Sequence, residues 1–560
     1  MSSMKTAEAI QLTSSNADGE PKHVDTKKLE RVNTVDPLRM VKVFASEHPS
    51  VLRSFWTLAN FLTNCRRSAF MKDSSTTELI VCHFDGYRKG RLTGPLIFAI
   101  CASALGSSFI FGYSIGVMNA PEKVIKAWIN STSSADKPYQ KEDLDNIWAS
   151  IVGFMSFGGL IGGMLSGYVA DRFGRRNGML LNNVIAFLGA GLMAGSKSGG
   201  SFVYLLIGRI VIGICCGINS AICPMYLTEI SPINLRGMLG SVNQLVVTIS
   251  ILVSQVLGLS SLLGTETLWP IVLLLTIVPA IFQLATLPFC PESPKYLLIH
   301  QQKLEAAKVA LQKLRQSNDV EAELQIMTDE SKKMLETPKV KFTDMFKDKV
   351  LRWALFICVM MMLSQQLSGI NAVMFYSTRI FDEGAGLGPE KAQYATMGVG
   401  ATNVIMTIVS TAIIDRAGRR TLHLIGLGGM WVTSIGLTIS MALLKQGMNT
   451  AVLCIIFVIL FVVAFATGPG AIPWFFVSEL FMQNARGHAT SVAVPVNWGA
   501  AFIVGWAFPP MQNAIGEYSF LVFAGFLTFF WLFTYKFVPE TKNRSVEDVV
   551  EGLKRSVGQK

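Results

Sequence analysis

The chain has 560 residues, 51% of them hydrophobic and 16% charged, and its formal net charge at pH 7 is +11. With a mean hydropathy of +0.42 it is too apolar for a soluble protein of this length, so the composition predicts a protein that crosses a membrane many times. The positive charge requires no nucleic acid partner, because positive loops beside acidic lipid account for it.

Twelve apolar stretches are each long enough to cross the hydrocarbon core of a bilayer, which is roughly 30 Å thick. The first six lie at about 93–117, 148–170, 178–196, 202–224, 238–260 and 268–289. The second six lie at about 351–375, 393–414, 421–443, 451–475, 488–508 and 518–538. The expected fold class is therefore an all-α membrane protein with two groups of six transmembrane helices.

The residues before the first span are the first of five predicted parts. Residues 1–92 are polar and mixed in charge, and we expect a cytoplasmic extension that is partly disordered. Within them, SVLRSFWTLANFL places apolar side chains at helical spacing beside basic ones, which predicts a helix on an anionic leaflet or a small helix packed on the protein or loosely ordered. The other parts are a six-helix bundle (93–289), a cytoplasmic helical linker (290–350), a second bundle (351–538) and a cytoplasmic tail (539–560).

Lys and Arg predict the orientation, because positively charged loops stay on the cytoplasmic side. The loops around 171–176 and 415–420 each carry three Arg, and the segment 290–350 is rich in Lys. Both termini are therefore expected in the cytoplasm, and the loop 118–147 outside the cell. That loop contains a sequon at Asn130, a predicted glycan acceptor, whereas the sequon at Asn543 falls on the cytoplasmic tail and should stay unmodified.

The charged hexapeptide DRFGRR (171–176) recurs as DRAGRR (415–420), and its surroundings recur with it. LTEISPINLRG has its counterpart in VSELFMQNARG, and PESP has its counterpart in PET. The motifs keep the same order and nearly the same spacing, which is typical of two duplicated halves. We interpret the charged residues as ion-pair locks that bias a two-state equilibrium. A role in membrane topology alone would explain the charge but not the accompanying Gly and Asp. The predicted lock residues are Arg172, Arg175, Arg176, Glu229, Arg236, Arg416, Arg419, Arg420, Glu479 and Arg486.

Catalytic and metal-binding patterns are missing from the sequence. The six His lie in the leader, the central loop or at span ends, and neither a metal-ligand spacing nor the Gly-Lys-Ser/Thr of a phosphate-binding loop is present. The nine Cys lie mainly within or beside spans and none falls in 118–147, so extracellular disulfides are not expected. We therefore expect no enzyme activity, no cofactor and no metal site.

Uncharged polar side chains form stripes within several spans. Because amides in a bilayer are unfavourable unless they find partners or water, these stripes should face the interior. A single Asn or Ser is best explained as a contact between helices, but amides in corresponding parts of both halves indicate a binding cavity. Since amides and hydroxyls both donate and accept, the cavity would suit a neutral polyhydroxylated ligand. The stripes contain Gln244, Thr248 and Gln255, then Gln365, Gln366, Ser368 and Asn371, and then Asn403, Thr407 and Ser410.

Two Trp and a Gly/Pro-rich stretch stand in the tenth and eleventh spans. Trp474 follows GPGAIP and Trp498 stands in PVNWG; such rings stack on the apolar face of a sugar, although Trp is also common at membrane interfaces. The Gly/Pro stretch cannot form an ordinary helix interior, which predicts a flexible gate or, alternatively, a static kink. Its residues are Gly468, Pro469, Gly470 and Pro473.

Several ordered motifs between about residues 93 and 550 resemble the sugar porters of the major facilitator superfamily, and among them the facilitative glucose transporters of animals. The motifs are FGYSIGVMNAP, DRFGRR, GRIVIGICCG, PESPKYL, QQLSGINAVMFYS, DRAGRR, GPGAIPWF and VPETK. The resemblance implies two six-span bundles in the plasma membrane, a hexose such as D-glucose held between them, passive transport by alternating access, and a monomer as the sufficient unit. The sugar-binding residues that it implies are Gln244, Gln365, Gln366, Asn371, Asn403, Trp474 and Trp498.

The chain departs from the glucose transporters at two positions. Ala466 stands where they usually have Glu, and Ala501 where they usually have Asn. Each change would remove a hydrogen bond to a hydroxyl, worth about 0.5–1.5 kcal/mol. The first span has Ser114 where proton-driven sugar porters carry an Asp, which predicts uniport. The alternatives are a sugar sensor with a transporter fold and a proton-coupled symporter that uses another acid.

Overall fold

The structure is a computed structural model, and it describes residues 91–133, 139–336, 340–542 and 544–556. The side chains at 233, 333–336, 415, 416, 483 and 556 are not described either. Four sequence predictions therefore lie wholly or almost wholly outside the described residues: the partly disordered extension 1–92, the helix in SVLRSFWTLANFL, the unmodified sequon at Asn543 and the ion pair of Arg416.

The first half begins with a span in three segments, α4 (Gly94–Ser103), a π-helical turn η4 (Ala104–Ser108) and α5 (Phe109–Gly116). The next spans are α7 (Lys141–Phe173), α8 (Arg175–Gly195), α9 (Phe202–Ile230), the short η5 (Ile233–Leu235) with α10 (Arg236–Leu257), and a last span made of α11 (Trp269–Leu274), α12 (Ile277–Thr286) and η6 (Leu287–Phe289). A short helix that the sequence reading missed, α6 (Glu122–Ser131), lies in the loop after the first span. It buries Ile125 and Ile129, which share one helix face.

The second half repeats this order with two interrupted spans. Its helices are α17 (Lys349–Leu367), α18 (Ile370–Arg379), η7 (Ile380–Gly384), α19 (Pro389–Ala417), α20 (Arg419–Lys445), α21 (Ala451–Thr467), α22 (Ile472–Glu479), α23 (Gln483–Ile515), η8 (Gly516–Tyr518) and α24 (Ser519–Phe537). Eleven stretches of the described chain qualify as membrane spans, and the last one, Asn484–Phe537, contains both α23 and α24. The predicted twelve spans in two sets of six are thus confirmed.

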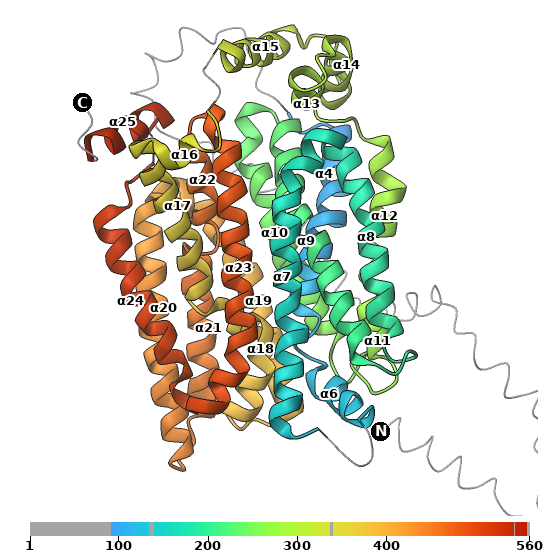
Figure 1. Ribbon diagram of the computed structural model, residues 1–560, viewed down its shortest axis with the longest axis vertical. Coiled ribbons are helices and arrows are strands. Elements are labelled where there is room, and N and C mark those ends of the chain that lie inside the picture. Colours follow the sequence, from blue (N-terminus) through green and yellow to red (C-terminus); the bar gives the residue numbers. More distant parts are fainter. Residues whose placement is uncertain (1–90, 134–138, 337–339, 543, 557–560) are drawn as a thin grey trace, which may run out of the picture. The chain divides into compact units, whose positions relative to one another are not determined.

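Small helices gather at one end of the spans, which we call the linker end. They are α13 (Pro294–Ile299), α14 (Leu304–Arg315), α15 (Glu321–Glu336), α16 (Asp344–Lys347) and α25 (Val546–Ser556), and they stand at the top of Figure 1. Ser293 caps α13 by accepting from the Tyr296 N–H, and Pro294 is the first residue of that helix. The opposite end carries α6 and is called the α6 end (Figure 1).

The two halves meet along two seams. Helix α7 of the first half packs against α23 of the second, and α10 packs against α19. Both halves belong to one compact unit that runs from Gly86 to Lys560. The seams therefore place residues from both halves around a common interior space.

Candidate functional site

A cavity of about 460 Å³ lies between the two halves, and all seven predicted binding residues line it. The first half contributes Gln244 from α10, and the second half contributes the rest from five helices. Within the described residues, its lining contains one charged side chain, Arg486, and no carboxylate. The predicted residues in the lining are Gln244, Gln365, Gln366, Asn371, Asn403, Trp474 and Trp498.

The amides of the second half are hydrogen-bonded to one another. Gln365 Nε2 donates to two backbone carbonyls, and its Oε1 accepts from Asn497 Nδ2 at 2.7 Å. Gln366 Nε2 donates to Asn497 Oδ1 at 2.9 Å, and Asn371 Nδ2 donates to Gln366 Oε1 at 2.6 Å. Asn497 thus connects Gln365 to Gln366, and through Gln366 to Asn371. It is not among the residues predicted from the sequence, although an amide inside a predicted span is the signal that could have found it.

Gln244 and Asn403 form no side-chain hydrogen bond with another described residue, so their amides are available to a ligand in the cavity. Thr407 and Ser410 line the cavity on α19, as their stripe predicts. Gln255 differs from Gln244, although both belong to one predicted stripe. It is buried at the seam against Gly400 and does not line the cavity, and neither of its amide atoms has a partner among the described residues.

The two Trp rings lie on different parts of the wall. Trp474 stands at the start of α22 and is half-buried. Trp498 is almost fully buried, with its ring centroid 5.4 Å from that of Phe111 and its Nε1 3.4 Å from Ser220 Oγ. Because Phe111 and Ser220 belong to the first half, the Trp498 indole bridges the two halves beside the cavity.

The predicted helix break separates α21 from α22. The chain leaves α21 after Thr467 and re-enters a helix at Ile472. Gly468 passes the neighbouring helix so closely that a Cβ would lie 2.3 Å from the Leu422 carbonyl oxygen, so no larger residue fits there. The carbonyls of Pro469 and Gly470 face the cavity wall, where they accept from Gln365 Nε2 at 3.0 and 2.7 Å.

The α6 end is closed by contacts between the halves. Asn119 donates to the Met374 carbonyl at 2.8 Å and accepts from the Thr378 N–H at 3.0 Å. Gln393 donates to the Ala120 carbonyl at 3.0 Å. The cavity lining instead reaches towards the linker end, where it includes Thr228, Ser478 and Arg486. The structure is thus closed at the α6 end.

A buried ion pair, which we call the α6-end clasp, adds to this closure. Arg379 of α18 donates to both carboxylate oxygens of Asp145 of α7, at 3.2 and 3.0 Å, and the two side chains are 2% and 4% exposed. Asp145 also accepts from Lys126 at 2.7 Å and from Asn513 at 2.8 Å. The sequence reading missed the clasp because its acid and base are 234 residues apart and lie outside the apolar windows.

The family described as sugar (and other) transporter matches residues 98–553. The chain belongs to the sugar transporter family. Facilitated glucose transporter protein 1 of Caenorhabditis elegans is 47% identical over 488 residues, which are 86% of this chain and 94% of that protein. Human solute carrier family 2, facilitated glucose transporter member 3, is 45% identical over 465 residues, which are 83% of this chain and 93% of that protein.

A solved structure confirms the predicted major facilitator fold. The major facilitator superfamily proton:xylose symporter XylE bound to 6-bromo-6-deoxy-D-glucose has a TM-score of 0.68 and 26% identity to this chain. The match covers 83% of this sugar transporter and 100% of the XylE chain.

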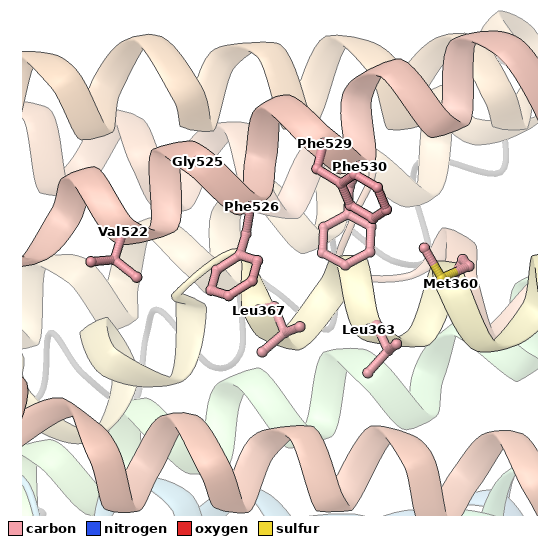
Figure 2. A pocket seen from close by; sticks show the side chains of 8 residues that line it. All are labelled: Met360, Leu363, Leu367, Val522, Gly525, Phe526, Phe529 and Phe530. Carbon is pink, nitrogen blue, oxygen red and sulfur yellow. The ribbon is translucent and has the colours of Figure 1, made fainter.

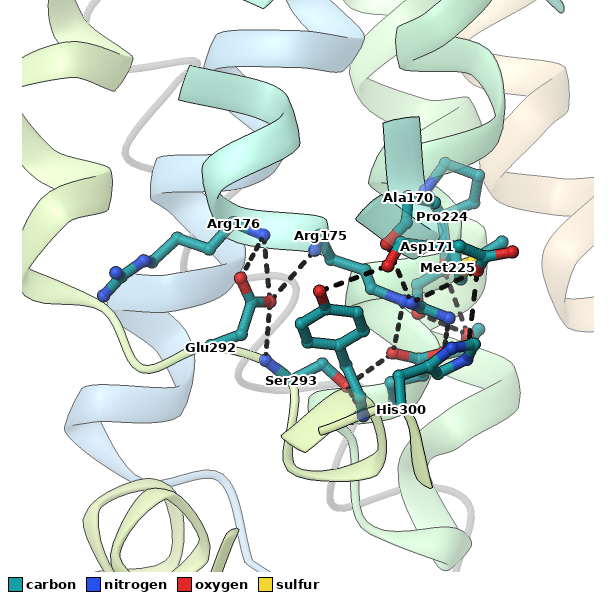
Figure 3. Close-up of polar contacts among 12 residues, drawn as sticks. Ala170, Asp171, Arg175, Arg176, Pro224, Met225, Glu292, Ser293 and His300 are labelled. Atoms are coloured by element: carbon teal, nitrogen blue, oxygen red, sulfur yellow. Dashed lines mark hydrogen bonds and ion pairs between the residues drawn. The ribbon is translucent and has the colours of Figure 1, made fainter. Parts of the chain in front are cut away.

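In the first copy of the repeated hexapeptide, Arg175 is the first residue of α8 and also forms an ion pair (Figure 3). Arg175 binds Glu229, with Nε 3.0 Å from Oε2 and Nη2 3.1 Å from Oε1. The Glu292 carboxylate accepts from the backbone N–H groups of Arg175 and Arg176 at 3.1 and 3.0 Å, and so satisfies the open N-terminus of α8. Ser293 also donates to Glu229, which explains why PESP accompanies the hexapeptide.

The second half repeats this arrangement. Arg419 Nε lies 3.2 Å from Glu479 Oε1, Glu540 accepts from the Arg419 N–H at 2.8 Å, and Thr541 donates to Glu479. The hexapeptide glycines have φ of +90° and +94° at Gly174 and Gly418, and a Cβ on either would lie 2.6 or 2.8 Å from the capping carboxylate. Only glycine fits both requirements, which is why the hexapeptide keeps it.

The other predicted lock residues whose side chains the structure describes do not reach these acids. Because successive helical residues point about 100° apart, Arg176 and Arg420 turn away and donate to the carbonyls of Cys290 and Tyr535. Burial raises the pKa of the Cys290 thiol to about 11, so it stays neutral beside Arg176. Arg172 is exposed. The Nε atoms of Arg236 and Arg486 are buried without a partner among the described residues, and Arg486 Nη2 donates to the Ser478 carbonyl.

A second hollow, of about 510 Å³, lies between α17 and α24 on the outer surface of the second half. Figure 2 shows that its walls carry no polar side chain; they are Met360, Leu363, Leu367, Val522, Gly525, Phe526, Phe529 and Phe530. Without hydrogen-bonding groups it cannot orient a polyhydroxylated ligand, so the cavity between the halves is the candidate site.

One buried cation lies near the first span. Arg209 of α9 is fully buried and donates to the carbonyls of Ser114 at 2.8 Å and Ile151 at 3.2 Å. Its Nη2 and the Ser114 hydroxyl have no partner among the described residues. The residue of the first span that lies beside Arg209 is therefore a neutral serine, and not an acid that could pair with the guanidinium.

Proposed function

We propose that this sugar transporter carries a hexose, D-glucose in the first instance, passively across the plasma membrane. The observation that carries the proposal is the cavity between the halves, which is lined by amides and indoles and has no carboxylate among its described residues. Amides suit the hydroxyls of a neutral sugar, and indole faces suit its apolar C–H groups. The relatives named as facilitated glucose transporters support the same substrate class.

Uniport is favoured over proton symport by the surroundings of Arg209. A proton-coupled carrier needs a group that gains and loses a proton within the transport path. The first span contains no Asp or Glu, and Ser114 occupies the place beside Arg209. A neutral serine does not gain and lose a proton, so the place beside Arg209 provides no coupling.

The transport cycle proposed is alternating access between the bundles 93–289 and 351–538, joined by the linker 290–350. With the linker end in the cytoplasm and one chain as the working unit, the described state would take sugar from the inside or release it there. The opposite state would require the α6-end contacts to part and the linker-end seam to close. Residues 1–92 would then serve trafficking or tuning rather than the transport step.

Uptake of radiolabelled D-glucose into proteoliposomes tests the proposal, with L-glucose as the stereochemical control. We expect saturable, D-specific uptake that stops at equal concentrations, with or without an inward proton gradient. Gln365→Ala, Trp474→Ala and Gln244→Ala should each lower this uptake. Accumulation above the outside concentration would refute uniport in favour of symport, and D-glucose binding without uptake would favour the sensor.

A further inference from the structure

Four amides on the second half of the cavity form one hydrogen-bonded chain, which we call the amide relay: Gln365, Gln366, Asn371 and Asn497. The relay starts at two backbone carbonyls in the break between α21 and α22, at 3.0 and 2.7 Å from Gln365 Nε2. A backbone carbonyl can only accept, so both must face the nitrogen of Gln365. Both N–H bonds of that amide are used in this way.

This start fixes the orientation of every amide that follows. With its nitrogen towards the break, Gln365 presents Oε1 to Asn497, which must donate through Nδ2. Asn497 Oδ1 then accepts from Gln366 Nε2, and Gln366 Oε1 accepts from Asn371 Nδ2. Turning any single amide around would set oxygen against oxygen or nitrogen against nitrogen at 2.6–2.9 Å. The relay therefore has one orientation while the break keeps its shape.

The orientation decides which atoms remain for a ligand. Gln366 directs its second N–H to Gln365 Oε1 at 3.4 Å, so that oxygen accepts two hydrogen bonds, and of the two glutamines only Gln366 keeps a free lone pair, on Oε1. Asn371, at the end of the relay, keeps Oδ1 and one N–H. Ala466 and Ala501 line the same cavity and add no polar group. This wall therefore offers mainly acceptors, whereas the sequence suggested amides that donate and accept alike.

We infer that Asn497 is a positioning residue of the sugar site, which holds the Gln366 amide with its oxygen towards the ligand. The sugar hydroxyls that meet this wall must then donate their hydrogen. The inference rests on the proposed function, because it needs a sugar in the cavity. It also ties the site to the helix break, since Gln365 loses both acceptors if the two carbonyls move.

Pairs of glucose analogues test this orientation in the wild-type protein. In each pair one hydroxyl is replaced either by hydrogen, which neither donates nor accepts, or by fluorine, which accepts weakly and cannot donate. A hydroxyl that donates to the relay loses the same contact in both analogues. Both should then inhibit D-glucose uptake equally, each about tenfold more weakly than glucose. A hydroxyl that accepts from an N–H would keep part of its contact in the fluorinated analogue.

Asn497→Ala and Asn497→Asp test the positioning role. Alanine leaves a Gln366 N–H without its acceptor and so frees a donor for the cavity, whereas aspartate still accepts from Gln366 and frees only a lone pair on Gln365 Oε1. The fluorinated analogues should therefore bind more tightly relative to the deoxy analogues in Asn497→Ala, and not in Asn497→Asp. The matched control is Asn182→Ala, which removes a buried amide that donates to the Cys215 carbonyl and Asn219 Oδ1 away from the cavity. This control should leave the ratio of inhibition by the fluorinated and deoxy analogues unchanged.

The outcomes separate the inference from the proposed function. Saturable D-glucose uptake with fluorinated analogues that bind more tightly than deoxy analogues at every hydroxyl overturns the relay but leaves hexose transport standing. An unchanged ratio between fluorinated and deoxy analogues in folded Asn497→Ala overturns the positioning role. Absence of any D-glucose uptake or displacement in the wild type overturns the proposed function itself. The wild-type series decides the orientation even if neither variant folds.

Discussion

Replacing Arg379 by Met should open the α6 end. Methionine keeps much of the length of the arginine stem but removes both hydrogen bonds to Asp145, at 3.2 and 3.0 Å. Since Asp145 lies on α7 and Arg379 on α18, the lost contact is one between the two halves. The substitution therefore acts on the state in which this end is closed, and within the second half it also removes the contacts of Arg379 with Asn513 and Glu383.

The expected magnitude follows from the partners that Asp145 retains. Breaking a buried ion pair costs about 3–5 kcal/mol when the other charge is left uncompensated. Here Lys126 and Asn513 still donate to Asp145 at 2.7 and 2.8 Å, so we expect about 2 kcal/mol, near the value of a hydrogen bond to a charged group. At 1.36 kcal/mol per factor of ten, the population of the closed state relative to the open state should fall about thirtyfold.

Hydrogen–deuterium exchange of the detergent-solubilised protein measures this shift. Amides in α6, α18 and the start of α7 should exchange faster in Arg379→Met, by up to about thirtyfold where opening limits exchange. Arg379→Lys, which keeps one donor, should fall between. The control is Lys445→Met: Lys445 binds Glu517 at the same end, but within the second half and in solvent, where a pair is worth about 0–1 kcal/mol.

Exchange that stays unchanged at the α6 end in Arg379→Met would refute the reasoning. So would an equal increase in Lys445→Met, because the effect would then come from removing any cation at this end. An increase spread over both halves would point to general destabilisation instead of opening.

Three further outcomes follow from the structure. Ser114→Asp would place a carboxylate in the first span beside buried Arg209, and uptake measured between pH 5.5 and 7.5 should become pH-dependent, unlike in the wild type. Gly174→Ala and Gly418→Ala should each lower stability by about 1–3 kcal/mol, and nearly additively because they lie in different halves, as thermal unfolding of the single and double variants would reveal. Asn130→Gln should abolish a glycan-dependent mobility shift in cells, since Asn130 is exposed at the α6 end; a glycan that persists would refute the assigned site.

The spans and the cavity could be predicted because their signals are local. Apolar windows mark each span, and amides at helical spacing mark the faces turned inward, as Gln244, Gln365 and Asn403 illustrate. The helix break was visible in the Gly and Pro around Gly468. The residues that signal each of these features lie within about one span of the sequence.

What escaped prediction depends on pairs that are distant in sequence. Asp145 and Arg379 each look like an ordinary charge at the end of a span, and only the packing of α7 beside the second half brings them together. The hydrogen-bond directions in the relay are equally invisible, because they start from backbone carbonyls in the break. A sequence shows that an amide is present, but not whether its oxygen or its nitrogen is already hydrogen-bonded to the protein.

The contacts divide into those that stiffen a half and those that join the halves. The Arg175–Glu229 pair joins α8 to α9, and the Arg419–Glu479 pair joins α20 to α22, so relative rotation of the halves can leave both intact. The clasp must break in such a rotation. At the α10–α19 seam, however, the buried amide of Gln255 has no partner among the described residues, which disfavours closure by about 1–3 kcal/mol. This term opposes the clasp and the other α6-end contacts, and opposed terms reduce the free-energy difference between the two states that a carrier must populate.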